Sequence, residues 1–270
     1  MKFSVLMCVY KNDNPEYFKE AIESVINQTV KPDEIVLVVD GPVSDEINQV
    51  IMNYENEKFF KIIRLKDNVG HGNARRIGLE HCSYELVALM NADDVSVPER
   101  FEKQLKCFEE NKNLSIVGGN IKEFIGSIDN IVGSREVPED DIEIKAFMRK
   151  RCPFNQMSVM FKSSEVIKAG GYLDWYCNED YYLWLRMYQN GATFRNIKDC
   201  LGYARVGKEM YQRRGGWKYF TSEARLQIYM LNCGIINLFE FVSNVMIRFI
   251  VQILMPNKVR EIFFQKFARK

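Results

Sequence analysis

Residues 86–94 read Leu-Val-Ala-Leu-Met-Asn-Ala-Asp-Asp, an apolar run that leads directly into two adjacent carboxylates. A buried strand that ends in this way places charge at its carboxyl end, the edge where open α/β sheets bind ligands. Because neighbouring carboxylates repel each other and are costly to desolvate, a divalent cation would stabilise them. Asp93 is therefore a candidate ligand for Mg²⁺ or Mn²⁺, which proteins often share with substrate phosphates. A solvated turn before the next helix is the alternative interpretation.

Short apolar runs alternate with helical patterns on both sides of this stretch. Four strands separated by helices predict a parallel, doubly wound sheet with right-handed crossovers. Further along, Ser96-Val97-Pro98-Glu99 has the pattern of a helix capping box, and residues 156–161 have that of a strand. The four strands are expected at residues 3–9, 35–39, 60–65 and 85–90, and the intervening helices at 15–26, 44–54 and 72–82.

The composition fits one globular domain, or one domain with an appendage, and gives no overall signal for a nucleic-acid partner. The chain has 270 residues, of which 47% are hydrophobic and 27% charged, and its net charge is +1. Residues 201–270 hold 12 Lys and Arg against 4 Asp and Glu, whereas residues 1–200 hold 25 against 32. We therefore expect different partners for the acidic body and the basic tail. Seven cysteines without a C-x-x-C pair, and no signal peptide at the first residues, predict a cytoplasmic location.

Two further strand ends carry side chains suited to a pyrimidine nucleotide. Asp40 ends the second strand and Tyr10 follows the first, so both are expected at the same sheet edge as Asp93. A carboxylate can accept from the imide N–H of the base and a tyrosine ring can stack on it. Arg75, near the start of the third helix, is a candidate for the diphosphate or the base. The glycines around it lack the third position of a dinucleotide fingerprint, which excludes NAD.

The second half of the chain contributes an acidic pair and a basic loop. Glu179 and Asp180 begin a helical pattern rich in aromatic residues, Trp184 among them. A carboxylate beside a sugar hydroxyl can act as general base, although an acidic pair at a helix start is also explained by the helix dipole. Arg213 and Arg214 precede two glycines, which suggests either a solvated loop or a mobile clamp on phosphate charge.

Residues 235–255 are largely apolar but do not have the pattern of a membrane-spanning helix. Their polar residues recur at helical spacing and form one stripe, and Pro256 then ends the helix. Residues 258–270 resume with a basic amphipathic pattern, so we expect residues 216–270 to form a helical region at a membrane surface. A helix pair that covers the sheet, or a homodimer interface, remains the alternative. The stripe consists of Asn237, Glu240, Asn244, Arg248 and Gln252.

Several of these segments, taken in order, resemble family-2 glycosyltransferases. The similarity covers about residues 3–230, and its later segments resemble the bacterial capsule and exopolysaccharide branch. Two positions depart from the family pattern: Asn91 occupies the first position of the D-x-D motif, and Gln156 stands where histidine is expected. The segments are V-x-M-C-V-Y-K-N, E-S-V-I-N-Q-T, E-I-V-L-V-V-D-G-P, N-V-G-x-G-N-A-R-R-x-G, N-A-D-D-x-S-x-P-E-R-F-x-x-Q and N-E-D-Y-Y-L-W-L-R.

The resemblance implies the A-type glycosyltransferase (GT-A) fold, with a Rossmann-like, mixed but mainly parallel sheet flanked by helices. It implies a catalytic domain at residues 1–215, with a nucleotide-sugar half at about 1–115 and an acceptor half at about 116–215. It also implies metal binding by Asp93 and a general base at Asp180. The implied nucleotide-binding residues are Tyr10, Asp40, Asn68, Arg75, Asn91 and Ala92. The residues expected on the acceptor or phosphate side are Glu179, Trp184, Arg213 and Arg214.

The sequence thus predicts an inverting hexosyltransferase at the inner face of the cell membrane. It would move sugar from a nucleotide-sugar donor to a lipid-linked saccharide in surface polysaccharide synthesis. The pocket chemistry above suits uridine or thymidine, and we expect a UDP-sugar. A catalytically silent relative that only binds sugar nucleotide or partner enzymes is the alternative, favoured by Asn91 and disfavoured by Asp180. A nucleotidyltransferase would need a glycine-rich loop after the first strand, and residues 10–13 read Tyr-Lys-Asn-Asp instead.

Overall fold

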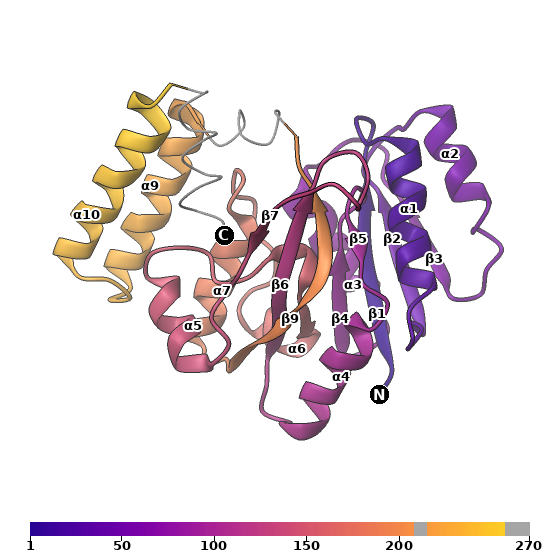
Figure 1. Ribbon diagram of the computed structural model, residues 1–270, viewed down its shortest axis with the longest axis horizontal. Helices are drawn as coiled ribbons and strands as arrows, with labels where there is room; N and C mark the ends of the chain where they lie inside the picture. The colour runs from indigo at the N-terminus through magenta and orange to yellow at the C-terminus, as the bar shows by residue number, and fades with distance from the viewer. Residues whose placement is uncertain (208–214, 257–270) are drawn as a thin grey trace.

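The computed structural model describes residues 1–207 and 215–256 of the chain. Its first half is a parallel sheet, as predicted, and the strand order is β3-β2-β1-β4 (Figure 1). The carboxyl ends of these four strands therefore lie along one edge. The elements follow one another as β1 (Phe3–Val9), α1 (Pro15–Ile26), β2 (Glu34–Val39), α2 (Asp45–Met52), β3 (Phe60–Arg64), α3 (His71–Glu80) and β4 (Leu86–Met90).

The second half extends this sheet with strands of both directions. β8 pairs antiparallel with β4 and with β6, and β6 then pairs parallel with β9 over most of its length. β5 and β7 add short antiparallel edges to β9 and β6. The result is a mixed sheet whose longest pairings are parallel. The bounds are β5 (Val95–Ser96), β6 (Ile116–Phe124), β7 (Ile131–Arg135), β8 (Met160–Lys162) and β9 (Phe194–Arg205).

Two hydrophobic cores, one on each face of the sheet, hold the layers together. Helices α1, α2 and α4 (Arg100–Glu110) bury their apolar residues in one core. Helices α3, α5 (Asp141–Met148) and α7 (Glu179–Gln189) contribute to the other core. Side chains alternate along β1, so that Val5 and Met7 join the first core and Leu6 joins the second. Burial on both faces explains why the parallel strands read as continuous apolar runs.

Two local predictions from the sequence are wrong. Ser96 does not cap a helix, because residues 95–96 pair as β5 with β9 and the helix begins only at Arg100. Residues 156–161 are not one strand, since Gln156–Ser158 forms a turn of 3₁₀-helix and β8 begins at Met160. At residues 95–96, strand pairing with β9 overrides the local pattern.

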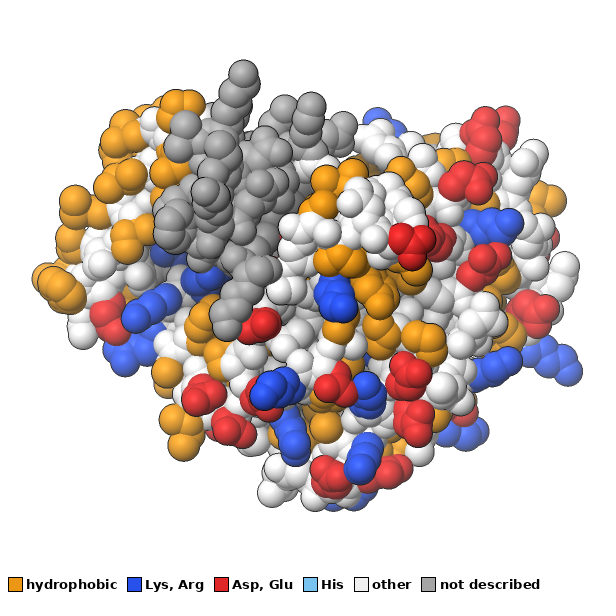
Figure 2. Space-filling view, in the orientation of Figure 1, with side chains coloured by type: hydrophobic (Ala, Val, Ile, Leu, Met, Phe, Trp, Pro, Cys, Tyr) orange, Lys and Arg blue, Asp and Glu red, His pale blue; other side chains and the backbone are white. Residues whose placement is uncertain are grey.

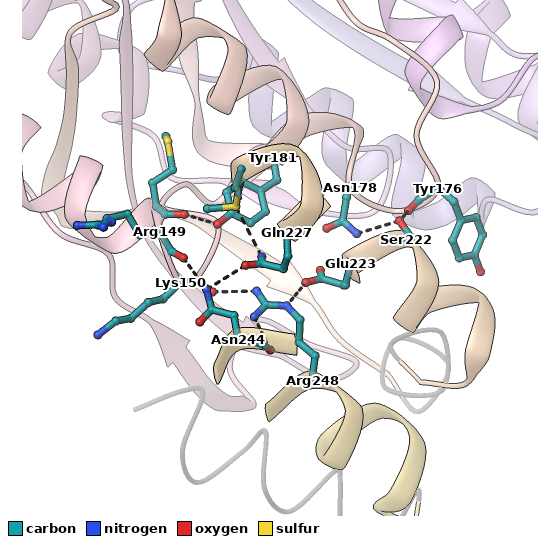
Figure 3. Close-up of polar contacts among 12 residues, drawn as sticks. Arg149, Lys150, Tyr176, Asn178, Tyr181, Ser222, Glu223, Gln227, Asn244 and Arg248 are labelled. Atoms are coloured by element: carbon teal, nitrogen blue, oxygen red, sulfur yellow. Dashed lines mark hydrogen bonds and ion pairs between the residues drawn. The ribbon is translucent and has the colours of Figure 1, made fainter. Parts of the chain in front are cut away.

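Two antiparallel helices, α9 (Trp217–Asn232) and α10 (Leu238–Phe249), stand side by side at the end of the molecule opposite α2 (Figure 1). The polar stripe of α10 faces the protein body. Asn244 Nδ2 donates to Gln227 Oε1 at 2.9 Å, and Arg248 Nε lies 2.5 Å from Glu223 Oε2, both partners being on α9 (Figure 3). At the start of α10, Glu240 pairs with Arg149 next to α5 at 2.6 Å.

The helical end is joined to the sheet by further polar contacts. Asn178 Nδ2 donates to Ser222 Oγ at 3.2 Å, which links the start of α7 to α9 (Figure 3). A π-helical turn, η2 (Ile250–Leu254), continues α10 and buries Gln252. Within residues 1–207 and 215–256, no helix is both long and apolar enough to cross a membrane.

The packing of α3 against the sheet leaves no space for a side chain at Gly78. A Cβ there would overlap Leu6 Cδ1 and lie 2.8 Å from Val38 Cγ2. We expect Gly78→Ala to destabilise the protein by about 1–3 kcal/mol, because overpacking outweighs the gain in helix propensity. Thermal or denaturant unfolding measures this loss. Gly207→Ala is the matched control, since a Cβ there meets nothing within 4 Å, and equal stability of the two variants would contradict the prediction.

Candidate functional site

The predicted nucleotide residues do gather at the carboxyl edge of the parallel sheet. Asp40 is buried, and its side chain fixes the turn before α3: Oδ1 accepts from the Val69 N–H at 2.7 Å, and Oδ2 accepts from Asn68 Nδ2 at 2.9 Å. Gly41 has φ +83°, and a Cβ there would lie 2.7 Å from the backbone nitrogen of Asn68. The close approach of strand end and turn therefore depends on this glycine. Tyr10 lies half-buried at the neighbouring strand end.

The four residues after β4 divide between the interior and the surface. Ala92 and Asp94 are buried, whereas Asp93 is exposed. Asp94 Oδ2 accepts from Asn91 Nδ2 at 2.9 Å, and Oδ1 accepts from the Arg205 backbone N–H at 2.9 Å. Burial, together with the neighbouring Asp93 carboxylate, raises the pKa of Asp94 to about 7. The two carboxylates thus have different environments, and Asp93 is the one that faces solvent.

Arg75 connects this loop to the acidic pair of the second half. Its guanidinium is buried, with Nη2 donating to Asn91 Oδ1 at 3.2 Å and Nη1 lying 3.5 Å from Glu179 Oε1. His71, one turn earlier on α3, places Nδ1 3.4 Å from the same Glu179 oxygen. The side chains predicted for nucleotide and acceptor therefore meet in one polar cluster.

Glu179 and Asp180 have opposite pKa shifts although they are adjacent. Burial opposes the charge of Glu179, but the hydrogen bond with His71 and the Arg75 guanidinium hold its pKa below the ordinary value. Burial and the Glu179 charge raise the pKa of Asp180 to about 6, while Arg75 and the Tyr181 N–H partly offset them. Asp180 is therefore a carboxylate at neutral pH with unusual affinity for a proton, which suits a general base.

One predicted acceptor-side residue, Trp184, is not part of this cluster. Trp184 is fully buried, and its ring packs against Phe154 and Phe161 at centroid distances of 5.7 and 6.2 Å. A contact with the acceptor would require the indole to leave the core, so we assign Trp184 to the core instead. Arg213 and Arg214 lie outside the described residues.

The structure adds residues that sequence reasoning missed. His71 is one of two histidines in the chain and begins α3, so its place in the turn before Arg75 was a usable signal. Tyr172 is fully buried, and its ring lies 5.9 Å from the Arg75 guanidinium. It ends the Gly-Gly-Tyr stretch, one of the later segments that resemble the exopolysaccharide branch, but it was not predicted at the site. Arg205 reaches Asp93 and Asp94 from the end of β9, more than a hundred residues away in sequence.

A divalent metal fits this edge only as an ion shared with a substrate. Among residues 1–207 and 215–256, no group of three or more His, Cys, Asp or Glu side chains could hold a metal alone. Both Asp94 oxygens accept hydrogen bonds, so the exposed Asp93 is the carboxylate placed to reach an ion. One or two carboxylates completed by phosphate oxygens and water is the usual arrangement for Mg²⁺.

This sheet topology, with a strand-end carboxylate pair opposite an acidic helix start, is that of a glycosyltransferase of the GT-A type. Residues 4–168 match the sequence profile of glycosyl transferase family 2, and the chain belongs to this family.

Similar sequences extend over the whole chain. An uncharacterized glycosyltransferase of Haemophilus influenzae is 41% identical over 270 residues, 100% of each chain. The amylovoran biosynthesis glycosyltransferase AmsE of Erwinia amylovora is 37% identical, with 98% of each chain covered. The UDP-Gal:alpha-D-GlcNAc-diphosphoundecaprenol beta-1,3-galactosyltransferase of Escherichia coli is 35% identical and covers 100% of this chain and 97% of its own. The protein is thus a glycosyltransferase whose relatives act in polysaccharide biosynthesis.

Solved structures support the fold. TarS 1-349 of S. aureus in complex with UDP-GlcNAc has a TM-score of 0.67 at 18% identity, covering 93% of this chain and 73% of that one. The mannosyltransferase PcManGT of Pyrobaculum calidifontis, in complex with GDP-Man and Mn2+, has a TM-score of 0.65 at 12% identity, covering 93% and 70%. At 18% and 12% identity, these similarities show a shared GT-A fold and no more.

The opposite shifts within the acidic pair lead to a direct prediction. Glu179→Gln is expected to lower the pKa of Asp180 from about 6 toward 3.8, because the like charge is removed while burial remains. Carbon-detected NMR titration of the aspartate side chains measures this shift. Glu80→Gln, which removes an exposed carboxylate paired with Arg76 on α3, is the control. An unchanged Asp180 titration in Glu179→Gln would contradict the electrostatic account.

Proposed function

We propose that this glycosyltransferase moves a hexosyl group, with inversion, from a UDP-sugar to a hydroxyl of a lipid-linked saccharide in surface polysaccharide synthesis. The observation that carries the proposal is the Asp180 carboxyl. Its pKa is raised to about 6 and it stands beside Glu179, which contacts Arg75 at the donor edge. A base adjacent to a donor-binding edge is what transfer to an acceptor hydroxyl requires.

The donor side is proposed from the strand ends. Tyr10 would stack on the base, while Asp40 and Asn68 would shape its pocket. The buried Arg75 would place positive charge toward the diphosphate. UDP-galactose is the first donor to assay, because the full-length E. coli relative is named for UDP-Gal and an N-acetylglucosaminyl diphospholipid.

In the proposed reaction the acceptor hydroxyl attacks the anomeric carbon from the face opposite the nucleotide. Asp180 takes the hydroxyl proton as the new C–O bond forms and the bond to the diphosphate oxygen breaks. Arg75 would stabilise the negative charge that grows on the departing diphosphate. A divalent ion held by Asp93 would supply further neutralisation of that charge. Inversion follows from a single displacement.

The chemistry of Asn91 argues against a catalytically silent relative. Its amide oxygen accepts from Arg75 and its amide nitrogen donates to Asp94. An aspartate at this position would accept from Arg75 but would repel the buried Asp94. Asn91 therefore links Asp94 to Arg75, which in turn contacts Glu179. The presence of asparagine instead of aspartate at this position does not by itself indicate lost activity.

The membrane location is proposed from the outer face of α10. The polar stripe is bound to the protein body, which leaves a row of apolar side chains exposed at the end of the molecule (Figure 2). Such a continuous face is uncommon on a soluble surface and suits a helix lying in the membrane interface. The exposed residues of this face are Leu238, Phe239, Val242, Met246, Ile247, Ile250 and Leu254.

An anionic lipid surface is the occupant we propose for this face. The last 14 residues, outside the described part, carry five Lys and Arg against one Glu. Each basic residue adds about 1 kcal/mol where it approaches anionic lipid. Docking at the cytoplasmic side would hold the Asp180 region near an acceptor that is itself anchored in the membrane. A homodimer through the same face is the competing occupant.

Asp180→Asn is expected to retain UDP binding while lowering kcat about 10²–10⁴-fold, because the proton acceptor is lost. The wild-type kcat/KM should also fall with unit slope as pH drops through about 6, since the carboxylate is the active form and its pKa is raised. Sugar transfer from UDP-galactose or another active UDP-sugar measures both effects.

The matched control for this kinetic test is Asp199→Asn, which removes an exposed carboxylate paired with Lys103 far from the site. Near wild-type turnover in Asp180→Asn would assign the base to another residue. Wild-type protein that binds no sugar nucleotide would overturn the proposed function.

The membrane proposal predicts that Phe239→Asp lowers vesicle binding about tenfold or more, because an exposed aromatic ring that would enter the lipid is replaced by a charge. Flotation with vesicles of phosphatidylglycerol and phosphatidylethanolamine measures this, and salt should weaken binding. Ile142→Asp is the control: Ile142 on α5 is 82% exposed and Phe239 is 83% exposed. Wild-type protein that stays in solution, or forms a dimer that Phe239→Asp dissociates, would favour the homodimer.

A further inference from the structure

Arg205, at the last position of β9, contacts three separate parts of the protein, although no sequence motif pointed to it. Its side chain is only 8% exposed. Nε donates to the backbone oxygen of Asp93 at 3.0 Å, and Nη1 donates to the backbone oxygen of Gly126 at 2.6 Å. Nη2 forms an ion pair with Glu20 of α1. One guanidinium thus joins the carboxylate loop, the β6–β7 hairpin and α1.

Two aromatic rings fix the guanidinium further. It lies 3.7 Å from the ring centre of Tyr17 on α1 and 4.4 Å from that of Phe124 on β6. The planar guanidinium of arginine stacks flat on aromatic rings and donates several hydrogen bonds in fixed directions. The ammonium group of lysine has neither the plane nor the fixed donor directions. The surroundings of Arg205 are therefore specific for the guanidinium group and not only for a positive charge.

The main chain of the same residue holds the loop at a second point. The Arg205 N–H donates to Asp94 Oδ1, while Nε contacts the Asp93 carbonyl. Asp93 is exposed between these two attachments. Arg205 therefore holds the Asp93 peptide group, the backbone that carries the carboxylate, against the end of β9.

We propose that Arg205 is a positioning residue that aims the Asp93 carboxylate at the metal-bound diphosphate of the donor. The proposal rests on the proposed function, because it takes Asp93 to be the metal ligand. Groups that orient a metal ligand without touching the metal commonly change metal affinity about 10–100-fold when they are removed. Arg205 would act in this way through hydrogen bonds to the loop and without contact with substrate.

The test is calorimetric binding of UDP at a series of Mn²⁺ concentrations, which needs neither acceptor nor turnover. Arg205→Lys is expected to raise the Mn²⁺ concentration for half-maximal UDP binding about 10–100-fold, with UDP binding in the absence of metal unchanged. Arg195→Lys is the matched control, since Arg195 lies on the same strand and forms an ion pair with the exposed Glu110 at 3.9 Å. It is expected to bind as wild type does.

A double-mutant cycle separates positioning from general damage. If Arg205 acts through Asp93, Arg205→Lys should have no further effect on Mn²⁺-dependent binding in an Asp93→Asn background. Additive losses would overturn the proposal, because Arg205 would then act elsewhere. A fall in melting temperature with unchanged Mn²⁺ dependence would also overturn it, leaving a structural role.

Tyr17→Leu provides a second variant if Arg205→Lys does not fold. It removes one stacking ring and leaves the guanidinium in place, so we expect a smaller rise in the half-saturating Mn²⁺ concentration. Wild-type Mn²⁺ dependence in a folded Tyr17→Leu protein would count against the proposal. Wild-type protein that binds UDP equally with and without Mn²⁺ would refute the metal role of Asp93, and the Arg205 proposal with it.

Discussion

The burial of Asp94 beside the exposed Asp93 is the constraint on which the rest of the site depends. A carboxylate removed from water is costly unless each oxygen finds a donor. Asn91 and the backbone of Arg205 provide those donors. Because Asn91 must present its nitrogen to Asp94, it presents its oxygen to Arg75, which in turn contacts Glu179. The requirement to satisfy one buried group thus orders a chain of residues from the end of β4, through α3, to the start of α7.

The strand ends were the predictable part of the site. Tyr10, Asp40 and Asp93 each follow a short apolar run, and parallel strands bring such positions to one edge whatever the details of packing. Arg205 comes from a segment whose partners lie far away in sequence, so no local pattern marks it. Trp184 was predicted on the acceptor side from its local sequence, but it lies in the core. An aromatic residue in a helix suits a sugar-binding face and a core equally well, and only the neighbouring Phe154 and Phe161 decide between them.

The C-terminal helices were predictable in pattern but not in orientation. The polar stripe of α10 suits headgroups or a protein surface, and its spacing is the same in both cases. Glu223 and Gln227 on α9 settle the orientation, because a charged or amide group buried against them would be costly to withdraw. Local periodicity therefore identified the helix, whereas tertiary partners determined which face is covered.

The bond between Arg205 and Asp94 also sets an order of events during synthesis. The two residues are 111 positions apart, so the first four strands leave the ribosome long before β9 exists. A nascent chain that ends near residue 115 already contains the four parallel strands, yet its carboxylate loop lacks the donor that Arg205 later brings. Asp94 must stay hydrated, or take up a proton, until β9 pairs with β6. The pairing of β9 is therefore the step that supplies the second hydrogen-bond donor to Asp94 and completes the carboxylate loop.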